Sequence, residues 1–298
     1  MSFPDILTLV VDRRHQSLST EAIDIARHLV KGVAPVTLSE GEAVEIACPA
    51  QTANGPSIET IRATLAPYKV DAIITKARGR RKAVLIADMD STILTGETLD
   101  DLAEVLHLGD AISIVTKAAM NGEIDFETSL RQRTQFLAGV PEQILEDVYQ
   151  KLTLNDGAFE LVQTMKAHGA RTALISGGFT WYTQRIAARC GFDENYGNVL
   201  DIQDGKITGK IVGDILGPQS KREHLDRLCE ERGIKLRASL TTGDGSNDIP
   251  MLEEAGLGIA FRAKPVVRRK IAQQVNFSTL RAHLFAQGYP ASAFTEIM

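Results

Sequence analysis

The sequence is poor in cysteine and has no long apolar run. Its three cysteines, Cys48, Cys190 and Cys229, are far apart, show no C-x-x-C spacing and cannot all pair within one chain. No window approaches the roughly 18 apolar residues that a membrane-spanning helix needs, and the first residues lack a secretory leader pattern. We therefore expect a protein of a reducing compartment, the cytoplasm, with no membrane contact.

The chain also lacks an excess of positive charge. Thirty-three Lys and Arg stand against 38 Asp and Glu, giving a net charge of −5, whereas nucleic-acid binding needs a concentrated basic face. The densest basic stretch, residues 76–82, has no aromatic side chain to stack on bases, and we interpret it as a solvated linker. The composition is that of a folded globular protein, and no nucleic-acid partner is expected.

The first 78 residues have the pattern of a small α+β domain. Apolar runs of strand length alternate with stretches of helical spacing in the order βαββαβ. This order is typical of a ferredoxin-like sandwich. The expected elements are a strand at 6–11, a helix at 22–29, strands at 36–38 and 43–48, a helix at 58–65 and a strand at 71–74.

Residues 79–298 have a different sequence pattern, that of an α/β domain with a doubly wound parallel sheet. Short apolar runs alternate with helical patterns, as the βα units of such a sheet do. More than eighty residues separate the first two runs and most of them have helical patterns, so we expect an inserted helical cap at about 96–155. Asp204-Gly205 between two extended segments predicts a hairpin. The expected sheet strands are 83–87, 172–175, 239–242 and 258–261.

Two acidic motifs directly follow predicted strands. Asp88 and Asp90 leave the first strand, and Asp244 and Asp248 leave the third. Taken singly, the first motif could be a helix N-cap and the second an ordinary acidic turn. Both lie at the same edge of one sheet, however, where they would repel each other unless a divalent cation that prefers oxygen ligands lay between them. Mg²⁺ is the natural candidate.

Two further motifs offer groups that bind anions. Ser176 and Gly177 follow the second strand in what we expect to be a loop, with a hydroxyl and closely spaced backbone N–H groups. Lys221 lies one residue after Ser220, and the spacing of Ser220 and Glu223 predicts a capping box that places the lysine in a first helical turn. The plain alternatives are a common loop and a surface lysine.

Together these motifs supply what phosphoryl transfer requires. A cation, a lysine and oriented amides offset the charge of a phosphate ester while a carboxylate attacks phosphorus. The attack would form an aspartyl phosphate, and a second, protonated carboxyl group would protonate the leaving alkoxide.

The four motifs, in this order and spacing, resemble those of the haloacid dehalogenase superfamily over residues 83–261. The resemblance implies a Rossmann-like core with an inserted helical cap of the C1 type. It implies that Asp88 is the nucleophile and Asp90 the general acid and base. It also implies that Mg²⁺ is held by Asp88, the Asp90 carbonyl and Asp244, while Asp248 orients the water shell of the metal. The phosphoryl oxygens would then be held by Ser176, Gly177 and Lys221. Asn247 would form a hydrogen bond with the bound substrate.

Within that superfamily, residues 88–98 and 120–133 resemble the phosphoserine phosphatase family. The resemblance implies that Glu97 holds the ammonium of O-phosphoserine, that Arg133 grips its carboxylate, and that Met120 and Phe126 close over it. The reaction would be the last step of serine biosynthesis. Independently, Phe126, Leu130 and Arg133 fall at i, i+4 and i+7, which places an apolar wall and a guanidinium on one helical face. A core Phe and a surface Arg would be the plain alternative.

Other interpretations remain at this point. A dehalogenase would need neither Asp90 nor Asp244, but a phosphatase for another small phosphoester would share the whole core. An amino-acid sensor with a decayed catalytic domain is a third possibility. The N-terminal domain resembles ACT-type regulatory domains, which leaves open binding of serine, a scaffold role or a homodimer formed through it. The histidines, including His107 and His224, show no metal-binding spacing.

Overall fold

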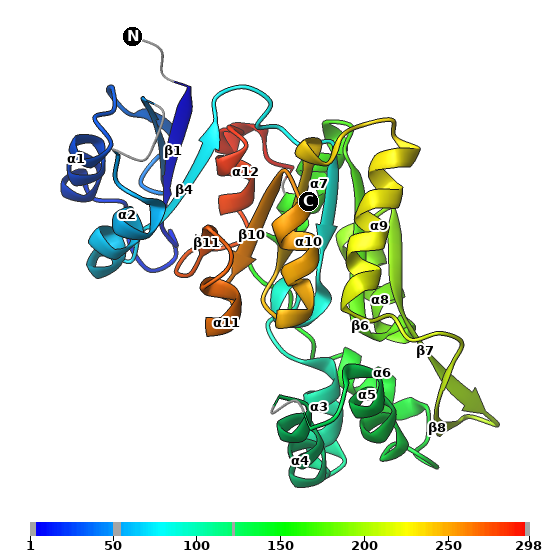
Figure 1. Ribbon diagram of the computed structural model, residues 1–298. Coiled ribbons are helices and arrows are strands. Elements are labelled where there is room, and N and C mark those ends of the chain that lie inside the picture. Colours follow the sequence, from blue (N-terminus) through cyan, green and yellow to red (C-terminus); the bar gives the residue numbers. More distant parts are fainter. Residues whose placement is uncertain (1–3, 50–54, 121–122, 296–298) are drawn as a thin grey trace.

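A computed structural model describes residues 4–49, 55–120 and 123–295. Two sheets lie side by side, a four-stranded one formed by the first part of the chain and a seven-stranded one formed by the rest, with a group of helices beyond one end of the larger sheet (Figure 1). Within the described residues, no helix combines the length and apolar character needed to cross a bilayer.

The four-stranded sheet is antiparallel and has the strand order β2-β3-β1-β4. The predicted βαββαβ succession is present, and the apolar sides of both helices pack on one face of the sheet. The elements are β1 (Asp5–Val10), α1 (Thr20–Leu29), β2 (Val36–Ser39), β3 (Ala43–Cys48), α2 (Ile58–Leu65) and β4 (Asp71–Lys76).

The larger sheet has the order β11-β10-β9-β5-β6-β7-β8, and all its neighbours are parallel except β7 and β8. The central strand β5 is buried throughout, as expected for a strand covered on both faces. The strands are β5 (Val84–Ala87), β6 (Arg171–Phe179), β7 (Glu194–Gln203), β8 (Lys206–Val212), β9 (Ser239–Gly243), β10 (Leu257–Phe261) and β11 (Gln273–Val275).

Helices cover both faces of this sheet and form two separate hydrophobic clusters with it. One face is packed by α7 (Ala158–Ala167), α8 (Thr180–Cys190) and α12 (Ala282–Ala286). The other is packed by α9 (Pro218–Glu231), α10 (Ile249–Glu254) and the short α11 (Pro265–Arg268). The arrangement is the doubly wound sheet that the sequence predicts.

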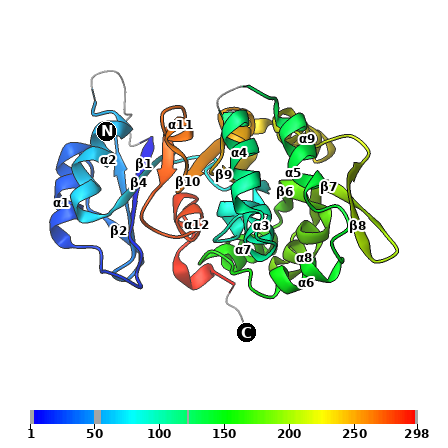
Figure 2. The same ribbon diagram turned by 90° about the horizontal axis from the view of Figure 1, so that it is seen from below.

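Four helices fill the predicted insertion between β5 and β6. They are α3 (Thr98–Val105), α4 (Gly109–Met120), α5 (Phe126–Gln135) and α6 (Gln143–Tyr149). Figure 2, seen from below, shows them grouped in front of the carboxyl edge of the parallel sheet. The predicted hairpin is also present, because β7 and β8 are joined by Asp204 and Gly205, both at positive φ.

Two local predictions are wrong. The Ser176-Gly177-Gly178 segment is not a separate loop but belongs to β6, whose register with β7 shifts between Ile175 and Phe179. Ser220 does not cap a helix. Helix α9 begins at Pro218, and the Ser220 hydroxyl instead accepts a hydrogen bond from Gly217 N at 3.2 Å. The Gly-Pro pair, with proline at the first helical position, is the stronger start signal.

The N-terminal sheet is joined to the larger one by buried polar contacts. Arg281 at the start of α12 donates two hydrogen bonds to Glu42, with both side chains almost completely buried. The carboxylate of Asp71 accepts hydrogen bonds from the backbone N–H groups of Asn276 and Ser278. Because breaking a buried pair of this kind strands a charge, the two sheets are held in one arrangement.

Candidate active site

The carboxyl end of β5 carries the first acidic motif. The chain leaves the strand at Asp88, whose carboxylate accepts a hydrogen bond from Met89 N at 2.8 Å. Its own backbone N–H donates to the Thr242 carbonyl of the neighbouring β9 at 3.0 Å. Ser91 takes a positive φ of 53°, a backbone conformation that turns the chain sharply. The turn presents Asp88 and Asp90 together at the sheet edge.

The second acidic motif meets the first, as the sequence predicts. Carboxylate oxygens of Asp88, Asp244 and Asp248 all lie within 4.8 Å of one another, and all three residues are buried. Burial raises the pKa of Asp244 to about 6. Burial, followed by the charge of Asp248, raises the pKa of Asp88. Three buried carboxylates at this spacing form an oxygen donor set suited to a hard divalent cation.

Lys221 lies behind this cluster. Its ammonium is 2.7 Å from an Asp88 oxygen and 2.6 Å from an Asp248 oxygen, and its side chain is only 1% exposed. Burial alone would lower the pKa of Lys221, but the two carboxylates outweigh that effect and raise it, so the lysine stays charged. Gly243 leaves room for the Asp248 carboxyl group, because a Cβ at residue 243 would lie 2.4 Å from the Asp248 carboxyl carbon.

Asp90 has separate partners on each oxygen. Thr98 N donates to one at 2.8 Å, and the Ser176 hydroxyl donates to the other at 3.1 Å. The same hydroxyl accepts a hydrogen bond from Gly178 N at 2.8 Å. Burial, reinforced by the charge of Glu97, raises the pKa of Asp90 to about 6. A carboxyl group in this range can both give and take a proton near neutral pH.

The helical insertion closes the site from the other side. A cavity of about 200 Å³ is lined by Asp88 and Asp90 from the core and by Glu97, Phe126 and Arg133 from the insertion. Phe126 and Arg133 share one face of α5, as their spacing predicts, and Phe126 lies close to the backbone of Gly177. Burial lowers the pKa of Arg133, which nevertheless remains a cation. The cavity therefore has an anionic and a cationic group within its insertion wall.

Lys264 is a site residue that the sequence analysis missed. Its ammonium lies 3.4 Å from Asp244 and 3.8 Å from Glu97, and its backbone N–H donates to the Asp244 carbonyl at 2.9 Å. Lys264 follows the predicted strand at 258–261 by three residues and so lies at the same sheet edge as the acidic motifs. That position was the signal that could have identified it.

A buried histidine supports the strand beneath the site. His283 Nδ1 lies 3.1 Å from the Leu280 carbonyl, and Nε2 lies 2.9 Å from the Thr242 hydroxyl. A carbonyl can only accept, so Nδ1 carries the proton and the Thr242 hydroxyl donates to Nε2. Burial lowers the pKa of His283 to about 3. The ring thus stays neutral. Its hydrogen bond holds Thr242 in place, and the Thr242 carbonyl accepts the hydrogen bond from the Asp88 backbone N–H.

The structure brings together most of the predicted site. Lys221 and Asp248 lie directly behind the cavity, in contact with each other. The side chain of Met120 lies outside the described part of the chain. The predicted residues that line the cavity are Asp88, Asp90, Glu97, Phe126, Arg133, Ser176, Gly177, Asp244 and Asn247.

Comparison with known proteins defines the class first. Residues 85–253 match the model of the haloacid dehalogenase-like hydrolases. The crystal structure of a hydrolase of that family from Salmonella enterica serovar Typhi superposes with a TM-score of 0.85 and 30% identity, covering 95% of this chain and 98% of that one. The fold, with its Rossmann-like α/β part, is therefore shared along nearly the whole chain.

The curated relatives are more specific. The chain is 44% identical over 201 residues to phosphoserine phosphatase from Haemophilus influenzae, covering 67% of this chain. This match spans 64% of the length of the Haemophilus protein, which is less than two thirds. This chain is also 40% identical over 195 residues to phosphoserine phosphatase from Lactococcus lactis, covering 65% of this chain and 90% of that protein. The chain thus belongs to the haloacid dehalogenase-like hydrolases and, within them, to the phosphoserine phosphatase family.

Proposed function

We propose that this protein hydrolyses O-phospho-L-serine to L-serine and phosphate through an aspartyl phosphate on Asp88, with Mg²⁺ as cofactor. One observation carries the proposal. The paired carboxyl groups of Asp88 and Asp90 face the same 200 Å³ cavity as Glu97 and Arg133. The first pair suits the chemistry of a phosphate monoester. The second offers counter-charges to the ammonium and carboxylate of an amino acid.

In the first half of the reaction, an Asp88 oxygen attacks phosphorus and the bond from phosphorus to the serine oxygen breaks. Asp90, protonated, gives its proton to the departing serine oxygen. The pKa of Asp90, raised by burial to about 6, leaves an appreciable protonated fraction near neutral pH. In the second half, water attacks phosphorus and gives a proton to Asp90. The bond from phosphorus to the Asp88 oxygen breaks and phosphate leaves, which restores both residues.

The donor set fits Mg²⁺. Asp88 and Asp244, with the Asp90 carbonyl, would hold the ion, and Asp248 would orient its water shell. When bound, Mg²⁺ supplies positive charge that stabilises the phosphoryl oxygens. Lys221 adds a fixed cation at Asp88, and Ser176 with the Gly177 backbone offers hydrogen bonds to the same oxygens. These groups together offset charge that would otherwise repel the attacking carboxylate.

Substrate choice is tested by replacing the two charged groups of the insertion. We expect Glu97→Gln and Arg133→Ala each to reduce kcat/KM for O-phosphoserine by about 10²-fold to 10³-fold, because each strands one charged group of the substrate. Hydrolysis of an aryl phosphate, which has neither group, should change less than about tenfold. Steady-state kinetics on both substrates provide the measurement.

The matched control is Arg131→Ala. Arg131 lies on the same helix, is exposed and pairs with Glu127, so its loss should leave both activities unchanged. Phosphoserine turnover that survived both cavity substitutions would contradict the substrate assignment and favour another small phosphoester.

Metal binding should depend on pH. We expect Mg²⁺ to raise the thermal unfolding temperature at pH 8 and to lose this effect as the pH falls below about 6. Burial raises the pKa of Asp244 to about 6 in the metal-free protein. Protons therefore compete with the ion below that pH, and the apparent affinity should fall about tenfold per pH unit. The Mg²⁺-induced shift is measured as the difference between the unfolding temperatures with Mg²⁺ and with chelator, from pH 5 to 8.

Asp244→Asn provides the control for that titration and should remove the Mg²⁺-induced shift at every pH. A shift of equal size at pH 5 and pH 8 in the natural protein would contradict the proposed ligand set.

The remaining assignments extend the proposal to the whole chain. We propose that residues 79–298 form the catalytic domain, with a C1-type cap at about 96–155, and that residues 1–78 form an ACT-like domain through which the chain forms a homodimer. The antiparallel order β2-β3-β1-β4 supports the second assignment. A cytoplasmic enzyme of serine biosynthesis accords with three cysteines that are all buried.

A further inference from the structure

A second, larger cavity lies between the two sheets. Its volume is about 1190 Å³, and both parts of the chain line it. On the side of the larger sheet it is bordered by residues at the starts of β10 and β11 and by Arg237 just before β9. The cavity therefore lies at the amino ends of the parallel strands, away from the carboxyl ends that bear the candidate active site.

Five cations on this cavity have no carboxylate partner. None of them lies within 4.0 Å of an Asp or Glu oxygen in the described part of the chain; they are Arg78, Arg81, Lys82, Arg237 and Lys270. Two other lining cations are already neutralised, Lys76 by Asp5 and Arg80 by Glu45. The chain as a whole carries a net charge of −5, so this concentration of positive charge is local.

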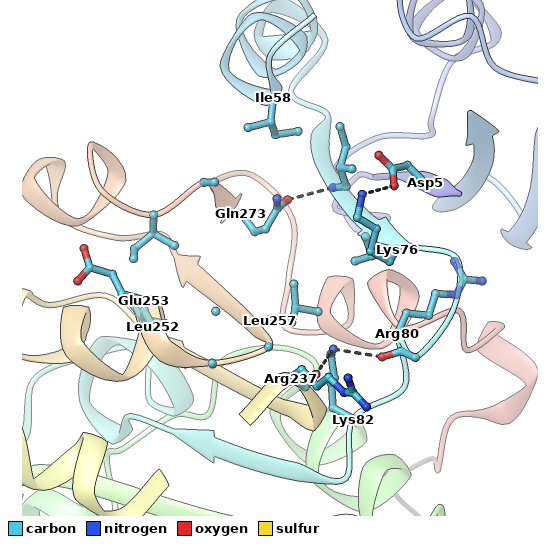
Figure 3. Close-up of a pocket in the computed structure, with 18 of the residues that line it drawn as sticks. Asp5, Ile58, Lys76, Arg80, Lys82, Arg237, Leu252, Glu253, Leu257 and Gln273 are labelled. Atoms are coloured by element: carbon cyan, nitrogen blue, oxygen red, sulfur yellow. Dashed lines mark hydrogen bonds and ion pairs between the residues drawn. The ribbon is translucent and has the colours of Figure 1, made fainter. Parts of the chain in front are cut away.

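Lys82 is the most constrained of the five. Its ammonium donates to two backbone carbonyls, Arg237 O at 2.7 Å and Gly79 O at 3.2 Å. Figure 3 shows Lys82 and Arg237 next to each other at one end of the cavity. Burial lowers the pKa of Lys82, which reflects a cation removed from water without an anion beside it. An anionic ligand would supply that missing charge.

The cavity also has an apolar wall formed from both units. Leu252 and Leu257 are buried on the side of the larger sheet, and Ile58 at the start of α2 lies on the other side (Figure 3). A simple inorganic anion would leave this wall and most of the volume unused. A ligand with several negative charges and an apolar or planar part would use both.

We propose that this inter-domain cavity binds a phosphorylated organic anion of nucleotide size. Five unpartnered cations and one lining carboxylate outside the ion pairs, Glu253, leave a net charge of about +4, which matches a triphosphate, and the apolar wall suits a base or similar group. An extended nucleic acid is disfavoured, because the lining residues include no aromatic side chain. Arg78 belongs to the connection after β4, whereas Arg237 and Lys270 belong to the larger unit. The bound ligand would therefore hold the two units together.

Isothermal titration calorimetry on the full chain tests the proposal with ATP and tripolyphosphate as probes. Chelator is present throughout, because the active site then lacks its metal and its carboxylates repel anions. We expect saturable binding of ATP that weakens as salt is raised. ATP should bind at least about threefold more tightly than tripolyphosphate, since only ATP has a group to place on the apolar wall.

Two double variants test the location. Lys82→Met with Arg237→Ala should weaken ATP binding at least about tenfold, because charge-assisted hydrogen bonds are lost. Arg78→Ala with Lys270→Ala should do the same, and since both of these side chains are exposed, this pair leaves the fold intact. The charge-matched control is Lys206→Met with Lys210→Met, two exposed positions on the distant β7–β8 hairpin, which should bind ATP like the natural protein.

Three results would overturn the proposal. They are the absence of saturable ATP binding, equal affinity in the natural protein and both double variants, and tighter binding of an oligonucleotide than of ATP. Hydrolysis of O-phosphoserine with Mg²⁺, measured on the same variants without ATP, keeps this test separate from the proposed activity. The cavity substitutions touch no active-site residue and should leave that hydrolysis unchanged.

Discussion

Asp88→Asn is expected to lower the rate of phosphate release from O-phosphoserine by at least about 10⁴-fold, the scale on which loss of a catalytic nucleophile acts. Asparagine keeps the shape of the side chain but has no anionic oxygen to attack phosphorus. It also removes one of the three clustered carboxylates within 4.8 Å of one another. The rate is measured as phosphate released per enzyme molecule per unit time in the presence of Mg²⁺.

Two controls separate loss of the nucleophile from loss of the fold. Asp204→Asn changes the same chemical group in a hairpin turn at positive φ, where asparagine is well tolerated, and should leave the rate unchanged. The Asp88→Asn protein should unfold at a temperature close to that of the natural metal-free protein. A variant that retained more than about a hundredth of the natural rate would contradict the role of Asp88 as nucleophile.

Lys221→Met is expected to have the largest effect on stability, about 3–5 kcal/mol in the free energy of unfolding. The ammonium is buried between Asp88 and Asp248, at 2.7 and 2.6 Å. Methionine fills similar space but leaves two buried carboxylates without a counter-charge. The pKa of Asp88, which burial already raises, should rise further in the folded variant, so the variant loses stability as the pH rises above the unfolded value. Denaturant unfolding in chelator at pH 5 and pH 8 should therefore show the larger loss at pH 8.

A double variant tests the cause of that loss. Asp248→Asn removes one of the two stranded charges, so adding it to Lys221→Met should recover part of the stability. Equal losses at both pH values, with no recovery in the double variant, would show that packing rather than charge is responsible.

Much of the fold could be predicted because its signals are local. The period of apolar residues identifies β3 and α2 with the bounds that the structure has, and Asp204-Gly205 specifies its hairpin. The acidic motifs could be placed together because parallel strands end at one sheet edge. The expected start of α9 is misplaced because Ser220 and Glu223 have the spacing of a capping box, although the helix begins two residues before Ser220, at Pro218.

The rest depends on contacts between distant parts of the chain. Glu42 and Arg281 are 239 residues apart, and neither has a local pattern that predicts a buried pair. Lys264 becomes a site residue only because its loop folds back onto Asp244. The basic stretch 76–82 was interpreted as a solvated linker, yet part of it lines the cavity between the two sheets. The spacing of residues along the sequence does not predict such long-range contacts.

The most direct test of the whole account is phosphate release from a panel of phospho-amino acids and small phosphoesters, each with Mg²⁺ and with chelator. We expect O-phosphoserine to be hydrolysed at the highest kcat/KM, and only when Mg²⁺ is present. Hydrolysis that persists in chelator would contradict the metal-dependent carboxylate chemistry, and a preference for a phosphoester without an amino-acid moiety would contradict the assignment of Glu97 and Arg133.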